Sequence, residues 1–150
     1  SIAALAGRGM LDTSLLANEL AYLLRGGWVK PVRAASCLQD AASISPLAGW
    51  RIVQVLENML PMVGEINRGS ALVQLLLQLA GEYGVSIKIP EVLQPKMKGS
   101  TVLVKNLRAL EKLEPHPTEL AEKARQHAQN LLDKRLGRDI TVKKEERNAN

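Results

Sequence analysis

Residues 70–84 read SALVQLLLQLAGEYG and carry the clearest structural signal in the chain. From Leu72 to Tyr83 the apolar side chains recur at helical spacing, so they share one face of a helix, while glutamine and glutamate mark the opposite face. Ser70 is suited to cap the N-terminus of this helix, and Gly84 follows its last residue, where glycine commonly ends a helix. The pattern therefore predicts an amphipathic helix over residues 70–83.

Similar start and stop signals recur on both sides of this segment. A leucine-rich run stops at Gly26, and Pro31 and Pro46 each suit the first position of a helix. Ser100 is suited to cap a further helix, and Gly137 to end the last one. The predicted helices span residues 12–25, 31–42, 46–60, 70–83, 100–113 and 118–136.

Each predicted helix has one apolar stripe that is expected to face the core. Val32, Val102 and Leu131 are among the residues that these stripes place inside. Between the helices, residues 85–89 alternate apolar and polar side chains as a strand does. No partner strand is evident in the sequence, so an extended connector is predicted there.

The composition favours an all-α fold. The chain is rich in leucine and alanine and has no phenylalanine, two tryptophans and two tyrosines, whereas strands prefer β-branched and aromatic residues. The helices are expected to pair as three antiparallel hairpins: 12–25 with 31–42, 46–60 with 70–83, and 100–113 with 118–136. Stacked hairpins of this kind form a short HEAT-like solenoid. A compact six-helix bundle remains an alternative.

The chain is predicted to comprise one helical domain over residues 1–137 and a charged, disordered tail over residues 138–150. Residues 1–7 form an apolar run without a capping residue, which is typical of the end of a helix. The domain is therefore expected to be the C-terminal block of a longer chain.

Cysteine use, hydropathy and charge exclude several classes of protein. A single cysteine cannot form an internal disulfide, and no apolar run approaches the ~20 residues that span a membrane. We therefore expect a cytoplasmic protein without a membrane segment. The net charge of +5 is spread along the chain, so no basic tail for nucleic acid is present.

No constellation of residues indicates an enzyme. Cys37 is predicted to be a buried helical residue between Ala35 and Leu38, where cysteine behaves as a small hydrophobe. His116 and His127 lack the further ligands that a zinc site needs. The sequence therefore predicts no catalytic residue, no metal ligand and no cofactor.

The turn over residues 25–33 is the first of two candidate recognition surfaces. It reads RGGWVKPVR and places cations beside an indole. Aromatic and basic side chains together often serve recognition, so Trp28, Lys30 and Arg33 are predicted to contact a partner. The alternative is that Trp28 closes the open end of the hairpin.

A basic ridge is the second candidate surface, and it indicates an alternative function as a helical module that binds nucleic acid. Its cations could contact phosphates, but only Trp28, far away in sequence, could stack on bases. The predicted ridge consists of Lys88, Lys96, Lys98, Lys105 and Arg108.

Three parts of the sequence carry a resemblance to a known family. They are residues 9–31, from GMLD to LRGGWVKP, residues 69–76 (GSALVQLL) and residues 99–102 (GSTV). They resemble the C-terminal region of large bacterial HEAT-like helical-repeat proteins, which are often encoded beside MoxR-type AAA ATPases and von Willebrand factor A domain proteins. The resemblance implies a solenoid end that binds a protein and has no catalytic residues. The expected function is thus a non-enzymatic scaffold or adaptor, whose partner is another protein or the remainder of its own chain.

Overall fold

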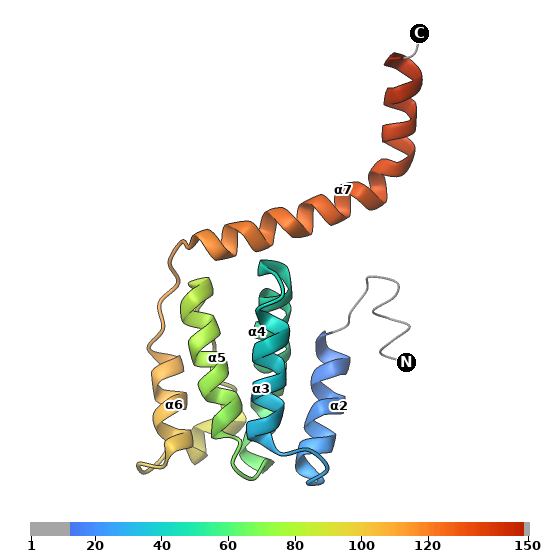
Figure 1. The fold of residues 1–150 in the computed structure, drawn as a ribbon. Coiled ribbons are helices and arrows are strands. Elements are labelled where there is room, and N and C mark those ends of the chain that lie inside the picture. The colour runs from blue at the N-terminus through green and yellow to red at the C-terminus, as the bar shows by residue number, and fades with distance from the viewer. Residues whose placement is uncertain (1–12, 149–150) are drawn as a thin grey trace.

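The computed structural model of the protein describes the backbone of residues 13–148 and the side chains of residues 13–136. Within this range the chain is all-helical and contains no strand (Figure 1). In chain order the elements are α2 (Thr13–Arg25), α3 (Pro31–Ala42), α4 (Pro46–Met59), the 3-10 helix η1 (Leu60–Glu65), α5 (Ser70–Tyr83), the 3-10 helix η2 (Glu91–Lys96), α6 (Val102–Glu111) and α7 (Glu119–Asn148). The proposed helix end at residues 1–7 lies outside the described residues.

Local capping explains most helix boundaries. Ser45 precedes α4 and its hydroxyl accepts a hydrogen bond from the backbone N–H of Ala48 at 3.0 Å, as the Ser-Pro sequence predicts. Gly84 ends α5 in the left-handed conformation at φ 66°. Thr118 plays the same role as Ser45 before α7, with its hydroxyl 3.1 Å from the N–H of Ala121.

Two predicted caps are wrong by one residue. The residue that precedes α5 is Gly69, which makes no side-chain capping bond, so Ser70 is the first residue of the helix rather than its cap. Before α6 the cap is Thr101, whose hydroxyl accepts from the N–H of Val104 at 3.2 Å. Ser100 therefore lies outside the helix.

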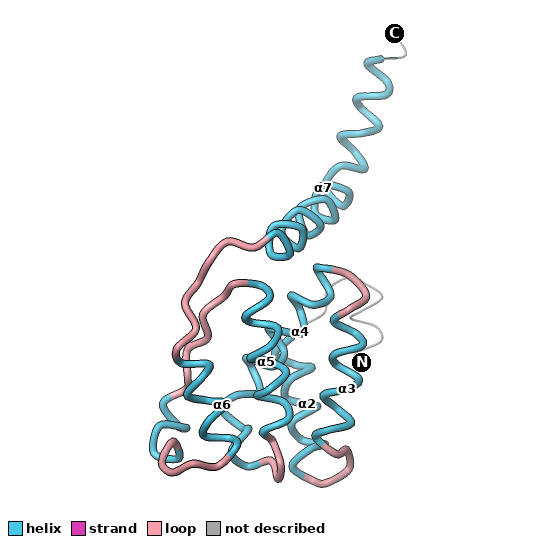
Figure 2. Tube along the Cα trace, turned by 60° about the vertical axis from the view of Figure 1, so that its left-hand side comes forward, coloured by secondary structure: helices cyan, strands magenta, loops and turns pink. Residues whose placement is uncertain are grey.

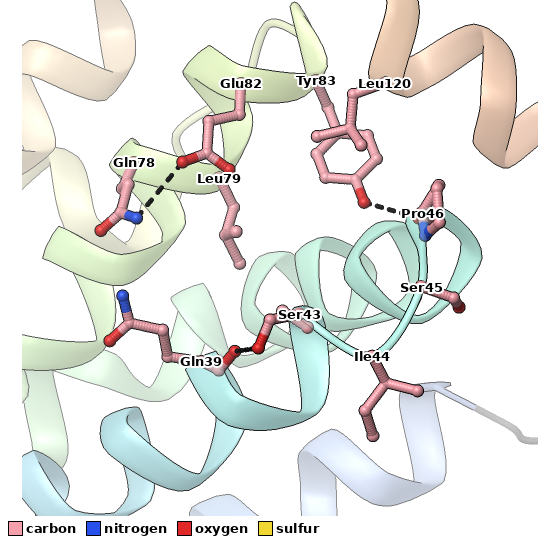
Figure 3. A pocket seen from close by; sticks show the side chains of 11 residues that line it. Gln39, Ser43, Ile44, Ser45, Pro46, Gln78, Leu79, Glu82, Tyr83 and Leu120 are labelled. Carbon is pink, nitrogen blue, oxygen red and sulfur yellow. Dashed lines mark hydrogen bonds between the residues drawn. The ribbon is translucent and has the colours of Figure 1, made fainter.

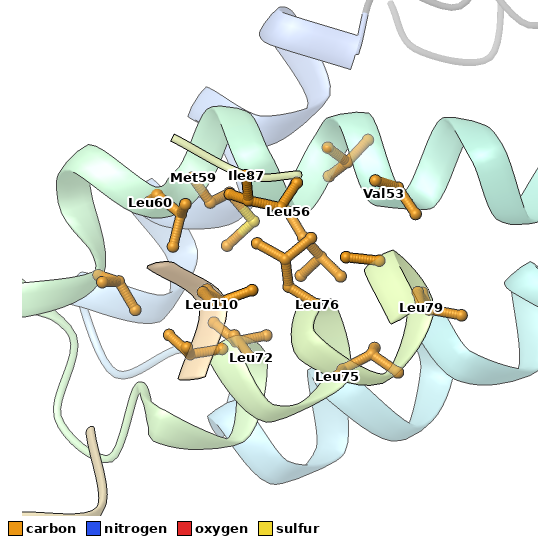
Figure 4. Packing of buried hydrophobic residues seen from close by; sticks show 14 of the residues in the cluster. Val53, Leu56, Met59, Leu60, Leu72, Leu75, Leu76, Leu79, Ile87 and Leu110 are labelled. Carbon is orange, nitrogen blue, oxygen red and sulfur yellow. The ribbon is translucent and has the colours of Figure 1, made fainter. Parts of the chain in front are cut away.

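The core lies around α4 and α5, whose leucines, valines and methionine interdigitate (Figure 4). Val55, Leu76 and Leu110 are fully buried, one from each of α4, α5 and α6. Ile87 and Ile89 of the connector are also buried. The strand-like alternation there thus reflects an extended segment that packs one side against helices, as predicted (Figure 2).

The packing of the helices differs from three stacked hairpins. The pair α4 and α5 packs as predicted, and α6 packs on α5. In contrast, the main contacts of α2 are with α4, those of α3 are with α4 and α5, and α7 crosses the ends of α4 and α5 (Figure 1). The two helices of the predicted α2–α3 hairpin, and likewise those of the predicted α6–α7 hairpin, thus pack mainly on the central helices α4 and α5 and make few direct contacts with each other.

The last helix is longer than predicted. Gly137 does not end it, and α7 continues to Asn148, so the expected domain boundary at residue 137 falls inside a helix. Its second half leaves the bundle and changes direction (Figure 1). Leu131, which was predicted to be buried, lies beyond the bundle contacts and is exposed, as are Leu132 and Leu136. None of the described helices combines the length and apolar character needed to cross a bilayer.

Two further residues predicted to be buried are exposed for a geometric reason. The buried residues of α3 include Ala34, and those of α6 include Val104. Val32 and Val102 each stand two positions earlier, which turns them roughly 200° away around a helix of 3.6 residues per turn. Both valines therefore face solvent.

Candidate functional site

The turn between α2 and α3 has the hydrogen bonds of a Schellman motif. The N–H of Trp28 donates to the carbonyl of Leu23 at 2.9 Å, and the N–H of Gly27 donates to that of Leu24 at 3.2 Å. Gly27 has a φ of 75°, which a residue without Cβ adopts readily. The two glycines of the sequence thus produce a defined turn that fixes where the Trp28 backbone lies.

Trp28 projects from this turn into solvent with 76% of its surface exposed. Its indole lies over Gly26, where a Cβ would lie 2.6 Å from the ring atom Cδ1. The absence of a side chain at Gly26 therefore makes room for the ring. The alternative in which Trp28 closes the end of the hairpin is wrong, because a closing residue would be buried.

A hollow of about 510 Å³ lies beside Trp28, between α2 and α3. It exists because both helices pack on α4 and make few contacts with each other. Its apolar lining comes from both helices and the turn. The residues that line the hollow are Leu20, Trp28, Val29, Lys30, Arg33, Ala34, Cys37 and Leu38. The structure thus brings together Trp28, Lys30 and Arg33, the three residues predicted from the sequence to contact a partner.

The rim of this α2–α3 hollow is positively charged. Arg25, at the end of α2, forms an ion pair with Glu65 of η1 at 3.1 Å. Lys30 and Arg33 form no ion pair with any described residue, and no acidic side chain lines the hollow. The charge of these two cations is therefore available to a ligand.

Cys37 is exposed and lines the same hollow, so the prediction of a buried cysteine is wrong. Arg33 and Cys37 stand four residues apart, which places them on the same face of α3. A face that carries an arginine is rarely the buried face of a helix. That spacing is the signal in the sequence that identifies Cys37 as a surface residue.

The predicted basic ridge is only partly brought together. All five of its side chains are exposed, and the Arg108 guanidinium donates from Nη2 to the carbonyl of Met97 at 2.8 Å. This bond holds α6 against the end of η2, where Lys96 is the last helical residue and Lys98 follows shortly after. The Lys96 ammonium lies over Gly64 of η1. No aromatic residue follows Tyr83 in the sequence, so these cations lack a stacking partner nearby.

A second hollow, of about 390 Å³, lies where α3, α4, α5 and α7 meet (Figure 3). The Ser43 hydroxyl donates to the carbonyl of Asp40 at 2.9 Å, and Gln78 donates to the Glu82 carboxylate at 3.3 Å. The Tyr83 hydroxyl donates to the carbonyl of Pro46 at 2.5 Å. These groups bond to their neighbours rather than converge on the cavity, so the hollow joins helix ends and presents no nucleophile with a base.

Tyr83 gives this second hollow a measurable pH response. Burial, followed by the negative charge of Glu82, raises the pKa of the Tyr83 phenol above its ordinary value of 10.0. The folded state thus holds the proton more tightly than the unfolded state. This contribution to stability is complete below pH 10 and is lost as the pH rises through the folded-state pKa.

We expect Tyr83→Phe to flatten the alkaline part of the stability profile. Urea unfolding at several pH values between 7 and 11 checks this, with Tyr22→Phe, an exposed tyrosine on α2, as the matched control. Near pH 7 the loss of the bond to Pro46 should lower stability by about 1 kcal/mol. If the free energy of unfolding fell equally steeply with rising alkaline pH in Tyr83→Phe and in the unsubstituted chain, the raised pKa of the Tyr83 phenol would be contradicted.

The histidines and paired glutamates do not form a metal site. Among the described side chains, no group of three or more His, Cys, Asp or Glu residues is placed to hold a metal ion. Glu119 pairs with Lys123 at 3.1 Å and Glu122 pairs with Arg125, both along the surface of α7. His116 Nδ1 lies 3.2 Å from the carbonyl of Glu114 in the preceding connector.

No known protein family, curated protein or solved structure matches the chain.

Proposed function

We propose that this protein is a non-enzymatic helical scaffold that binds another protein, or another part of its own polypeptide, through the α2–α3 hollow. The observation that carries this proposal is Trp28, which is 76% exposed beside an apolar hollow of about 510 Å³ with two unpaired cations on its rim. Tryptophan and arginine dominate the energetically important positions of protein interfaces.

The architecture and the partner that we propose for the protein follow from the sequence resemblance. In it, the chain is a block of a cytoplasmic HEAT-like solenoid, and the partner is a protein such as an AAA ATPase or a von Willebrand factor A domain protein. The central α4–α5 hairpin, with further helices against both of its sides, is compatible with a solenoid and also with a closed bundle. Neither arrangement requires a cofactor.

The test is an affinity pull-down from the native lysate with the immobilised chain, with and without nuclease, followed by mass spectrometry. We expect a defined protein that survives nuclease and is lost from the Trp28→Ala and Arg33→Ala variants. Tyr22→Ala is the matched control, because Tyr22 is an exposed aromatic on α2 that does not line the hollow. Retention of the same proteins by Trp28→Ala would refute the proposal.

Nucleic-acid binding through the basic ridge is the second candidate function. It is supported by the bond from Arg108 to Met97, which joins α6, with Lys105 and Arg108, to the segment that carries Lys96 and Lys98. Four of the five ridge cations thus lie on adjoining segments. Binding to phosphates weakens steeply as salt rises, whereas binding at an apolar hollow changes little. This candidate would be favoured if the chain recovers nucleic acid from the lysate and if nuclease or high salt abolishes that recovery. The Trp28→Ala variant should then still recover nucleic acid.

A further inference from the structure

We propose that the occupant of the α2–α3 hollow is an acidic amphipathic helix of a partner protein. This inference rests on the proposed function and specifies the chemistry of the partner. It follows from the shape of the hollow, from its charge and from the charges of the other segments that could fill it.

The shape of the hollow suits a helix. Two helices form its sides, with Leu20 on α2 and Ala34 and Leu38 on α3, and Trp28 stands at the end where the chain turns. The lining residues of α3 occupy positions i, i+1, i+4 and i+5, which is one helical face over more than a turn. Ala34, on the floor of the hollow, is itself buried against the bundle. The groove left between two helices that pack little on each other is filled most completely by the apolar stripe of another helix, as in groove recognition of amphipathic helices.

The charge of the hollow selects an acidic helix. Its floor is apolar, and its only charged lining residues are Lys30 and Arg33. An arginine guanidinium binds a carboxylate through two parallel hydrogen bonds, which adds geometric selectivity to the attraction. A partner helix with leucine-like residues on one stripe and glutamate or aspartate along its edge would meet both features.

The chain's own segments do not have this chemistry. The exposed leucines of α7, Leu131, Leu132 and Leu136, stand among Asp133, Lys134 and Arg135, so this stretch carries no net negative charge to offer a cationic rim. Residues 1–12 contain one arginine and one aspartate and carry no net negative charge. The net charge of +5 also opposes the approach of a second copy. Charge complementarity therefore assigns the hollow to a different, acidic protein.

The experiment measures fluorescence anisotropy of two labelled synthetic peptides with the full chain at physiological salt. Both are helix-forming 18-residue peptides with the same leucine stripe, and they differ in carrying glutamate or lysine along its edges. We expect the glutamate peptide to bind the unsubstituted chain at least tenfold more tightly than the lysine peptide. Arg33→Glu brings the charge of the two rim residues from +2 to 0, so it should remove most of this preference, and Trp28→Ala should weaken the binding of both peptides.

Other results overturn the inference. Equal affinity of the unsubstituted chain for the two peptides, or an undiminished preference with Arg33→Glu, would show that charge does not select the occupant. A Leu5→Asp variant that binds the glutamate peptide tenfold more tightly would show that residues 1–12 fill the hollow. A dimer in sedimentation that Trp28→Ala dissociates would assign it to a second copy.

The outcome is separable from that of the proposed function. If the pull-down yields a protein that depends on Trp28 while the glutamate peptide fails, the scaffold proposal stands and only the acidic helix is refuted. If Trp28→Ala changes neither experiment, both proposals fall. Circular dichroism of each variant at the same concentration verifies that the exposed substitutions at residues 28 and 33 leave the helices intact.

Discussion

Gly84→Ala is expected to lower the free energy of unfolding by about 2–5 kcal/mol, because two independent constraints act at this residue. Gly84 has a φ of 66°, a conformation that is unfavourable for residues with a Cβ by roughly 1–2 kcal/mol. A Cβ at this position would also overlap the carbonyl oxygen of His116 and lie 2.8 Å from Cγ2 of Thr118.

The overlap cannot be relieved by a simple side-chain movement. The N–H of His116 donates to the carbonyl of Gly84 at 2.9 Å, so the two backbones are held together at the point of contact. A Cβ would have to displace the connector that leads into α7. We therefore expect the substitution to weaken the packing of α7 across α4 and α5 as well as to strain the turn.

Two companion variants separate the constraints in urea unfolding followed by circular dichroism. Gly84→Asn tolerates the left-handed conformation better but keeps the overlap, so it should recover only part of the loss. Gly81→Ala lies one turn earlier in α5 with open space around a new Cβ, and it should stabilise the chain by about 0.5–1 kcal/mol. A loss below about 1 kcal/mol in Gly84→Ala would contradict the close approach of the connector.

Helix boundaries were predictable where the signals are local. The Ser45 cap, the left-handed Gly84 and the Gly26-Gly27 turn depend on hydrogen bonds within five residues, and these the sequence specifies directly. Gly137 shows the limit of such signals. Glycine ends a helix when the chain turns into the left-handed conformation, and otherwise it is tolerated inside a helix at about 1 kcal/mol.

The buried face of α3 was not predictable from its own residues. The helix is rich in small side chains, so a stripe through Val32, Ala35 and Leu38 and a stripe through Ala34, Leu38 and Ala42 are nearly equivalent by hydropathy. The position of α4 decides between them, and it favours the second. The exposure of Val32 follows from that tertiary choice, whereas the exposure of Cys37 is already indicated by Arg33 on the same helical face.

The candidate site was predictable in its residues but not in its shape. Trp28, Lys30 and Arg33 are close in sequence around one turn, so their proximity follows from the turn itself. The hollow beside them depends on α2 and α3 both packing on α4, which no pattern within either helix indicates. The hollow is therefore a consequence of long-range packing.

Leu76→Ala is expected to destabilise the protein by about 3 kcal/mol, within the 2–5 kcal/mol typical of buried leucines. Leu76 is fully buried on α5, at the centre of the cluster that α4, α5, α6 and the connector form (Figure 4). Its neighbours come from several elements that are fixed by their own packing, so they cannot collapse into the space that the substitution leaves. We therefore expect most of the energetic cost of the cavity to appear as a loss in the free energy of unfolding.

Thermal unfolding by circular dichroism measures this effect, and a loss of this size should lower Tm by about 10 °C in a domain of this length. Leu132→Ala is the matched control, because this leucine lies in α7 beyond the bundle and is 49% exposed. Alanine is also the better helix former, so the control should change stability by less than about 0.5 kcal/mol. If instead Leu132→Ala were as damaging as Leu76→Ala, the middle of α7 would have to be packed in solution. That result would show that this part of α7 contributes to folding, whereas a large difference between the two leucines would locate the folding energy in the α4–α5 core.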